Sequence, residues 1–170
     1  MKLGAFLWPF GHHLAAWRHP STPQNAANDF PHYMQMAQTA ERGLFDMLFV
    51  ADTTGLIATD PENLSRISYV AWMEPITLMS ALSAVTKHIG LACTSSTSYD
   101  QPYHLARRFG SLDIISGGRA AWNLITTANP LEAANFSRDP HPDKDVRYRR
   151  AREFAEVVKG LWESWEDDAF

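Results

Sequence analysis

The feature that most constrains this chain is a regular alternation between two hydrophobic periods. Short continuous apolar runs, which are typical of buried strands, alternate with stripes of apolar residues at helical spacing. The runs occupy residues 2–8, 45–51, 89–97 and 120–127. Because a helix-length segment separates each run from the next, the strands can pair in parallel through right-handed crossovers. The pattern therefore predicts an α/β protein built from four βα units.

The first three predicted helices have recognisable boundaries. One follows an apolar stripe through residues 30–44, and we expect Gly43 to end it in a left-handed conformation. Pro75 suits the first turn of the second helix, where its missing N–H is not needed. The third helix is expected to end at Gly117 and Gly118.

The fourth predicted helix has the clearest stripe of the chain. Its exposed side carries Arg149 and Glu153, and also Arg152 and Glu156, at the four-residue spacing of helical ion pairs. Its apolar face consists of Ala151, Phe154, Ala155, Val158, Leu161, Trp162 and Trp165. We expect that face to pack against the rest of the domain.

Two architectures fit four such units, a doubly wound open sheet and part of a (β/α)8 barrel. The turn after the first strand, residues 10–14, lacks a glycine-rich phosphate fingerprint, and so do the other turns. A nucleotide-binding doubly wound fold is therefore disfavoured. Units of roughly 30 to 45 residues suit a barrel, for which about 31 residues per unit plus inserted loops are expected. We predict the N-terminal half of a TIM (β/α)8 barrel.

Composition excludes several kinds of partner. The 170 residues are 45% hydrophobic and 20% charged, which is ordinary for a globular domain. The net charge is −4, and the basic residues are scattered apart from a cluster at residues 147–152, so nucleic acid is not expected as a partner. No apolar stretch approaches the roughly 18 residues that a membrane span needs.

The interrupted apolar segment at the N-terminus and the single cysteine favour a cytoplasmic location. Pro9 and Gly11 interrupt the segment 3–10, and no clean small-residue cleavage site follows it, so a signal peptide is not expected. The single cysteine, Cys93, lies in an apolar run and has no partner for an internal disulfide. A buried, inert thiol in a reducing compartment is the expected state.

In a barrel, functional residues follow the carboxyl ends of the strands. His12, His13 and His19 follow the first strand without a carboxylate or cysteine at ligand spacing, which favours a pocket-lining loop over a metal site. A surface loop without a role is the alternative. Asp52 follows the second strand, where it can bind a ligand or cap the next turn, and the two interpretations are balanced.

The third and fourth strands end in uncharged polar residues. Residues 94–99, beginning with Thr94, supply hydroxyl groups that can hydrogen-bond a polar heterocycle. A nucleophilic serine is not expected, because no Gly-x-Ser-x-Gly elbow surrounds them. Asn123 lies within the fourth strand, and a buried unpaired amide would cost roughly 1–3 kcal/mol. We therefore expect Asn123 to meet either a hydrogen-bond network or a ligand.

One long run and two shorter ones carry a resemblance to a known family. The long run is Tyr103–Thr127, YHLARRFGSLDIISGGRAAWNLITT, and the shorter ones are Ala16–Pro20 and Tyr148–Trp165. They resemble the bacterial luciferase-like flavin-dependent monooxygenases, most closely the nitrilotriacetate and dibenzothiophene sulfone monooxygenase subfamily. The resemblance extends over essentially the whole chain.

This resemblance implies a TIM-barrel enzyme of the two-component type. Such an enzyme takes reduced FMN from a separate NAD(P)H:flavin reductase and uses O2 to oxidise a small organic substrate. Xenobiotic, sulfur-containing and nitrogen-containing molecules are candidate substrates. The resemblance also implies a homo-oligomer, and it does not assign a catalytic residue or a metal.

The resemblance also implies positions for the cofactor. Asp52 matches the acidic flavin contact after the second strand, Thr94 matches a hydroxyl contact at the end of the third, and Tyr148 matches a tyrosine at the start of the fourth helix. The family usually has a histidine four residues before that tyrosine, where this chain has Lys144. His141 replaces that histidine only if the loop is realigned.

Three further residues are assigned to the same site by the resemblance. Asn123 is expected on the flavin side, and His12 and His13 on the flavin or substrate side. Full-length members are more than twice as long as this chain. We therefore expect residues 1–170 to be a partial luciferase-like barrel domain, truncated before the second half and without the phosphate-binding loops that follow strands seven and eight.

Three alternative functions remain open from the sequence. One is a metal-dependent barrel hydrolase that uses the histidine loop and Asp52. Another is a non-catalytic half-barrel with an interaction or vestigial role. The third is a related barrel that reduces a deazaflavin cofactor, which the run Tyr103–Thr127 disfavours.

Overall fold

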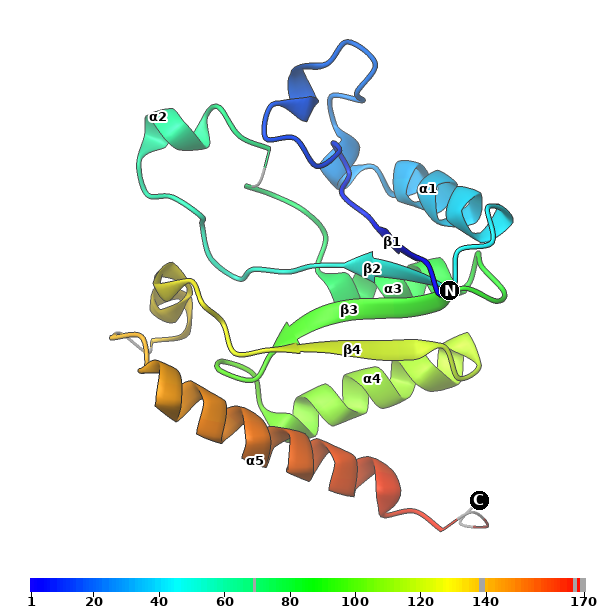
Figure 1. Cartoon of the computed structure of the whole chain (residues 1–170), viewed down its shortest axis with the longest axis vertical. Coiled ribbons are helices and arrows are strands. Elements are labelled where there is room, and N and C mark those ends of the chain that lie inside the picture. The colour runs from blue at the N-terminus through cyan, green and yellow to red at the C-terminus, as the bar shows by residue number, and fades with distance from the viewer. Residues whose placement is uncertain (69, 138–139, 167, 169–170) are drawn as a thin grey trace.

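The computed structural model describes residues 1–68, 70–137, 140–166 and 168, and shows one parallel four-stranded sheet. The strand order is β1-β2-β3-β4, the order of the chain (Figure 1). The strands are β1 (Gly4–Phe6), β2 (Met47–Val50), β3 (Gly90–Ser96) and β4 (Ala120–Ile125). The four predicted strands are confirmed, although β1 is shorter than the apolar run that encodes it.

The strand order decides between the two architectures. Right-handed crossovers between strands that follow chain order place every connecting helix on the same face of the sheet, whereas a doubly wound sheet reverses its order midway. The connecting helices are α1 (Phe30–Arg42), α3 (Pro75–Ser83), α4 (Pro102–Ser116) and α5 (Lys144–Glu163). The shorter segments in the loops are η1 (Ala16–Arg18), η2 (Ala26–Asn28), α2 (Pro61–Leu64) and η3 (Pro130–Phe136). The α/β class and the half-barrel arrangement are confirmed.

The hydrophobic core lies between the sheet and the helices. Alternate strand residues such as Leu48 and Leu91 are fully buried against the helices. Trp122 points the same way, because its ring lies 6.0 Å from Phe109 and 5.9 Å from Phe154. The helices contribute Leu78, Met79, Leu82, Leu105, Phe109, Leu112, Phe154 and Val158. Of the apolar face predicted for the fourth helix, Phe154 and Val158 belong to this core and Leu161 packs against it.

The buried thiol belongs to this core, as expected. Cys93 is fully buried on β3. Burial raises the pKa of the Cys93 thiol to about 12, and the neighbouring charges of Glu74 and Asp52 raise it as well. The thiol is therefore uncharged and unreactive at neutral pH.

The other face of the sheet, which is the interior side of a barrel, is only partly covered. Phe6 of β1 and Phe49 of β2 are register partners whose rings lie 4.9 Å apart. Phe6 is still 44% exposed. Ala92 and Ala121 continue the row across β3 and β4.

Two local predictions about helix ends are corrected by the structure. Gly43 follows α1 with a φ of −76°, so it is not left-handed. Leu44 takes the left-handed conformation instead, with a φ of 59°. The predicted end of α4 is confirmed, because Gly117 and Gly118 have φ values of 71° and 83°.

The long C-terminal helix also departs from expectation in detail. It ends at Glu163, so Trp165 lies beyond it. The ion pairs among the described residues join Lys2 to Asp46, Arg66 to Glu62 and Arg108 to Asp100. The expected pairs along α5 are not among them, which is consistent with the small stabilisation that exposed helical ion pairs provide. None of the described helices combines the length and apolar character that crossing a membrane requires.

At the amino-terminal edge of the sheet, one carboxylate caps the turn that enters β3. Glu41 Oε1 accepts hydrogen bonds from the backbone N–H groups of Lys87, His88 and Ile89 at 2.8, 2.8 and 3.1 Å. Partial burial alone would raise the pKa of Glu41, but the three backbone donors and the nearby His88 imidazole together lower it. The carboxylate thus binds α1 to the start of β3.

We expect Glu41→Gln to change how stability depends on pH. The pKa of Glu41 is lower in the folded state, so its contribution is present above the unfolded pKa of about 4.5 and is lost as the pH falls through the folded value. Urea unfolding should show the variant less stable than wild type at pH 7, and the difference should shrink towards pH 3. A difference that stays constant over this pH range would contradict the expectation.

Candidate functional site

The carboxyl ends of the four parallel strands open into loops at one edge of the sheet (Figure 1). The loops span residues 7–29, 51–74, 97–101 and 126–143. In an α/β barrel this edge carries the functional groups. Five of the six predicted site residues lie in these loops or at the strand ends beside them.

Thr94 and Asn123 form the best-defined polar pair at this edge. They are register partners on β3 and β4, and Asn123 Nδ2 donates a hydrogen bond of 2.9 Å to Thr94 Oγ1. Thr94 is almost completely buried. Asn123, expected to meet either a hydrogen-bond network or a ligand, thus has one partner within the protein, the Thr94 hydroxyl, on the face of the sheet that carries Phe49.

Asp52 lies two residues beyond the end of β2 and does not cap a helix. Its Oδ1 accepts a hydrogen bond of 3.1 Å from Trp72 Nε1, and the Trp72 ring lies 5.3 Å from that of Trp8. Burial raises the pKa of Asp52; the Trp72 hydrogen bond opposes the rise, and the charges of Glu74 and Glu132 add to it. The backbone N–H of Thr53, at the next turn, also hydrogen-bonds Asp52 and lowers its pKa, so the ligand-binding role of Asp52 stays a prediction.

A buried carboxylate that the sequence did not single out fixes the loop after Asp52. Glu132 of η3 is 3% exposed and accepts hydrogen bonds from Thr53 Oγ1 at 2.8 Å, Thr54 N at 3.2 Å and Thr54 Oγ1 at 2.5 Å. A Cβ at Gly55 would come within 2.9 Å of the Glu132 backbone, so only glycine fits there. Nearby, Asn135 Nδ2 donates to Thr54 O. The loop after β2 is therefore held by the loop after β4.

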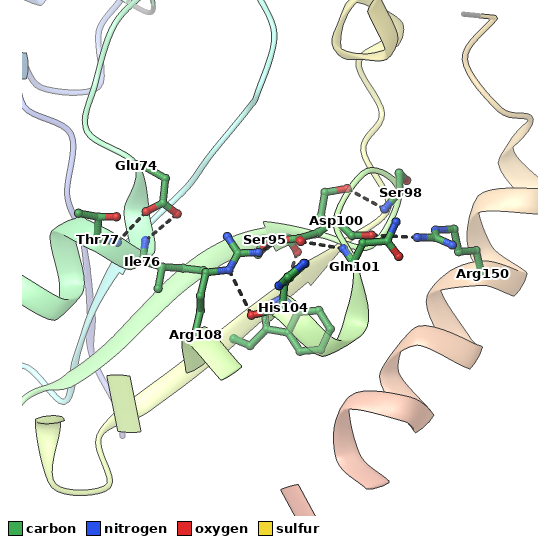
Figure 2. A network of polar contacts seen from close by, with 12 residues as sticks. Glu74, Ile76, Thr77, Ser95, Ser98, Asp100, Gln101, His104, Arg108 and Arg150 are labelled. Atoms are coloured by element: carbon green, nitrogen blue, oxygen red, sulfur yellow. Dashed lines mark hydrogen bonds and ion pairs between the residues drawn. The ribbon is translucent and has the colours of Figure 1, made fainter. Parts of the chain in front are cut away.

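Half of the basic cluster on α5 is used inside the protein. Arg147 donates to the carbonyl oxygens of Thr126 and Thr127 at the end of β4, the former at 2.8 Å. Arg150 donates to Thr97 O at 2.8 Å and to Asp100 O at 2.9 Å (Figure 2). Each arginine therefore fixes the exit of one strand.

The loop after β3 has a second brace from α4. Figure 2 shows Asp100 between α4 and α5, where its carboxylate pairs with Arg108 and accepts from Gln101 N at 2.7 Å. Ser95 Oγ at the end of β3 donates to the same carboxylate at 3.4 Å. The loop after β3 is therefore braced by both α4 and α5.

Tyr148 lies apart from the pair formed by Thr94 and Asn123. It is 57% exposed on the second turn of α5, and Lys144 Nζ stands 5.7 Å from the centre of its ring. It lines an open groove of about 890 Å³ along β4 together with Thr126 and Thr127. Its flavin contact stays a prediction.

The three histidines considered for the site, His12, His13 and His141, have different hydrogen-bond partners. His12 Nε2 is 3.0 Å from Phe6 O, and its ring lies 4.7 Å from the Phe6 ring, so it covers the end of β1. His13 Nδ1 accepts from Ala15 N at 3.1 Å. His141 Nδ1 is hydrogen-bonded to the Tyr99 hydroxyl, at the rim of β3. Within the described residues, no three histidine, cysteine or carboxylate side chains are grouped to hold a metal ion.

Comparison with known proteins identifies the family to which this geometry belongs. The family model described as luciferase-like monooxygenase matches residues 10–169. The chain belongs to this family. The luciferase-like chain is 48% identical, over its full length, to N-acetyl-S-(2-succino)cysteine monooxygenase of Bacillus subtilis (strain 168).

Two further curated relatives confirm the predicted subfamily. The luciferase-like chain is 44% identical over 177 aligned residues to nitrilotriacetate monooxygenase component A of Aminobacter aminovorans. It is 43% identical, over 93% of its length, to dibenzothiophene-sulfone monooxygenase of Rhodococcus erythropolis. The chain spans 37%, 39% and 36% of these three relatives, in the order given, which is well under half of each.

Solved structures show the same partial match. EDTA monooxygenase from Chelativorans sp. BNC1 superimposes with a TM-score of 0.90 and 37% identity, and the luciferase-like chain covers 41% of it. A riboflavin lyase solved with a modified FMN and riboflavin has a TM-score of 0.90 and 33% identity, with 39% covered. The luciferase-like chain thus corresponds to about two fifths of these TIM-barrel proteins.

Proposed function

We propose that this chain forms one wall of the reduced-FMN site of a two-component monooxygenase that oxidises a small organic substrate with O2. The observation that carries the proposal is the placement of Asp52 just beyond the end of β2 and of the Thr94–Asn123 pair on the neighbouring strands β3 and β4. The family membership and the flavin in a solved relative support it. In this proposal residues 1–170 act as the first part of a longer barrel domain.

The polar groups at this edge suit a flavin ring, which has both hydrogen-bond donors and acceptors along its polar end. Because Asn123 donates to Thr94 Oγ1, the Thr94 hydrogen remains available to donate and Asn123 Oδ1 remains available to accept. Asp52 adds a carboxylate whose raised pKa makes sharing a proton with a ligand easier. In this proposal Asn123 and Thr94 orient the flavin, Asp52 binds it, and His12 and His13 face the substrate.

A bound reduced flavin supplies the activation of O2, and the chain supplies placement and a dry surface. Phe6 and Phe49 present adjacent rings on the interior face, and the Trp8 and Trp72 rings lie 5.3 Å apart beside Asp52. Apolar rings around a reacting centre keep water away from it. Trp122 has a different role, since it packs into the core.

The proposed partners are a flavin reductase, O2, a small organic substrate and further copies of the chain. A reductase is supported by the relative named as component A of nitrilotriacetate monooxygenase, since that name denotes one part of a multi-component system. Tyr148 is proposed as a further flavin contact from α5, and the exposure of its ring leaves it accessible to one.

We expect Asp52→Ala to weaken flavin binding when the chain is continued by the second half of such a barrel. Losing a hydrogen-bond partner to a bound group costs roughly 1–3 kcal/mol, or about 5- to 150-fold in the dissociation constant. Fluorescence titration with FMN measures the change. Asp52→Asn should lose less flavin affinity, and Asp168→Ala, at an exposed residue, should lose none. Unchanged flavin affinity in Asp52→Ala would remove Asp52 from the site.

We also expect the complete enzyme to depend on a separate source of reduced flavin. The relative named as component A of nitrilotriacetate monooxygenase supports a separate reductase, so NADH and FMN alone should give no substrate oxidation. Adding a flavin reductase with NAD(P)H should restore O2 consumption coupled to product. Turnover with NADH in rigorously reductase-free protein would contradict a two-component mechanism.

A further inference from the structure

A groove of about 850 Å³ lies outside the residues that the resemblance assigns to the flavin. It separates the loop after β1 from the segment around α2, two parts of the chain that lie on the same side of the sheet edge in Figure 1. A hydrogen bond of 3.2 Å from Trp17 Nε1 to Arg66 O joins its two sides. Its lining includes Phe10, Trp17, Arg18, His19, Gln24, Asn25, Leu64, Ile67, Ser68 and Val70.

The groove contains a cation, Arg18, that has no carboxylate partner among the described residues. Arg18 Cζ stacks 5.0 Å from the centre of the Trp17 ring, and that ring is fixed by its bond to Arg66 O. Two other arginines of the chain, Arg66 and Arg108, are paired with carboxylates. In the described part of the chain Arg18 has no such pair, so a stacked guanidinium is presented to the groove without a counter-ion.

His19 presents a second donor to the same groove. Its Nδ1 accepts a hydrogen bond from Ser21 N at 3.3 Å and lies 2.7 Å from Ser21 Oγ. A ring nitrogen that accepts from a backbone N–H carries no proton, so the proton of the neutral ring is on Nε2. His19 Nε2 therefore carries the hydrogen and can donate it to a ligand in the groove.

Ser68 supplies an independent sign that a ligand belongs here. Its side chain is only 6% exposed and lines the groove, yet its hydroxyl oxygen has no hydrogen-bond partner among the described residues. Burying a hydroxyl without a partner costs free energy, so such groups usually meet one. A ligand oxygen in the groove would satisfy it.

The rest of the lining defines the chemistry of that ligand. No aspartate or glutamate is among its described residues, although the chain as a whole carries a net charge of −4. Amides from Gln24 and Asn25 and apolar side chains such as Leu64 and Ile67 complete the walls. A lining that offers hydrogen-bond donors and has no acidic side chain suits a carboxylate ligand. The apolar walls suit the carbon skeleton that bears the carboxylate.

We propose that this groove is the substrate subsite for the carboxylate of an organic acid, bound by Arg18, His19 and Ser68. The proposal rests on the proposed monooxygenase function, because it places the substrate beside the flavin wall. It defines a substrate class, an organic anion with an apolar body, and it assigns to Arg18 the role of selecting for charge.

The subsite can be tested without flavin, by calorimetric titration of the protein with hexanoate. Hexanamide, which is neutral and nearly isosteric, should bind at least tenfold more weakly, and inorganic phosphate should also bind more weakly than hexanoate. Arg18→Gln should weaken hexanoate binding at least tenfold, with partial rescue in Arg18→Lys. The matched control is Arg107→Gln, since Arg107 also stacks on an aromatic ring, 5.8 Å from that of Tyr103, but outside the groove.

A second variant separates binding from structure. Ser68→Ala should weaken hexanoate binding at least threefold while leaving the unfolding temperature unchanged or higher, because the hydroxyl has no hydrogen-bond partner among the described residues. Equal binding of hexanoate and hexanamide, hexanoate affinity that survives Arg18→Gln, or phosphate binding as tight as hexanoate would overturn the proposal. The hexanoate titration contains no flavin, so a negative result there does not bear on the proposed flavin contact of Asp52. A negative result in the FMN titration of Asp52→Ala likewise does not bear on hexanoate binding.

Discussion

A polypeptide consisting only of residues 1–170 is expected to self-associate and to bind FMN poorly. β1 and β4 are the two edges of the sheet, and the interior face carries exposed apolar side chains such as Phe6 and Met47. Unpaired edges and uncovered apolar faces recruit other chains, whereas a closed barrel has neither. Sedimentation velocity should therefore show dimers or larger species at micromolar concentration.

A charge on the uncovered face should reduce this association. Met47 is 41% exposed on that face, so Met47→Lys should shift the sedimentation distribution towards monomer. Ile114→Lys is the matched control, because Ile114 is 82% exposed on α4 and should have little effect. FMN binding should remain weak in all three proteins, since the loops that bind phosphate in such barrels follow later strands. A stable monomer with micromolar FMN affinity would refute this account.

Arg119→Ala is expected to lower the free energy of unfolding by about 2–4 kcal/mol. Arg119, which directly precedes β4, donates hydrogen bonds to five acceptors. Two of them are carbonyl oxygens of the turn between α3 and β3, and a third is the carbonyl oxygen of Ser83 at the end of α3. The five are Ser83 O at 3.0 Å, Thr86 O at 3.2 Å, Thr86 Oγ1 at 3.1 Å, Ile89 O at 2.8 Å and Ser116 O at 2.7 Å. Removing the side chain leaves these partly buried acceptors without a donor.

The expected loss in the free energy of unfolding is smaller than the sum of five separate hydrogen bonds. The reason is that Arg119 is only half-buried and water can reach some of the acceptors. Urea unfolding at one low protein concentration measures it. Arg119→Lys should lose less stability than Arg119→Ala, since one ammonium group reaches some of the acceptors but fewer than the guanidinium does. Arg152→Ala, an exposed arginine on α5, should change stability by less than about 0.5 kcal/mol. An Arg119→Ala protein as stable as Arg152→Ala would show that the network contributes little.

The elements of the fold were predictable because their signals are local. Each strand is a continuous apolar run and each helix a stripe, and both can be read within about ten residues. The sequence placed Thr94 and Asn123 towards the carboxyl ends of their strands, but their pairing with each other comes from the register of the fold. The wrong detail at Gly43 has a local cause too, since the left-handed residue can lie one position further along, at Leu44.

The braces of the site were not predictable from the same signals. Glu132 binds residues 78 and 79 positions away in the chain, and two of its three donors are hydroxyls of ordinary loop residues. Arg147 and Arg150 bind backbone carbonyl oxygens, which every residue possesses, so no pattern of side chains marks their partners. In the sequence they were a basic cluster, and only the fold separates them from the exposed Arg149 and Arg152.

The bracing of β3 and β4 by α5 bears on how such barrels can be assembled and recombined. The hydrogen bonds of Arg147 and Arg150 lie entirely within this stretch of chain, so the strand exits that hold Thr94 and Asn123 can reach their final geometry while later strands are still being synthesised. A chimera of two such monooxygenases joined after Glu163 would keep the strand ends of β3 and β4 together with the arginines that brace them. One joined after Ile125 would separate the strands from the helix that sets their ends.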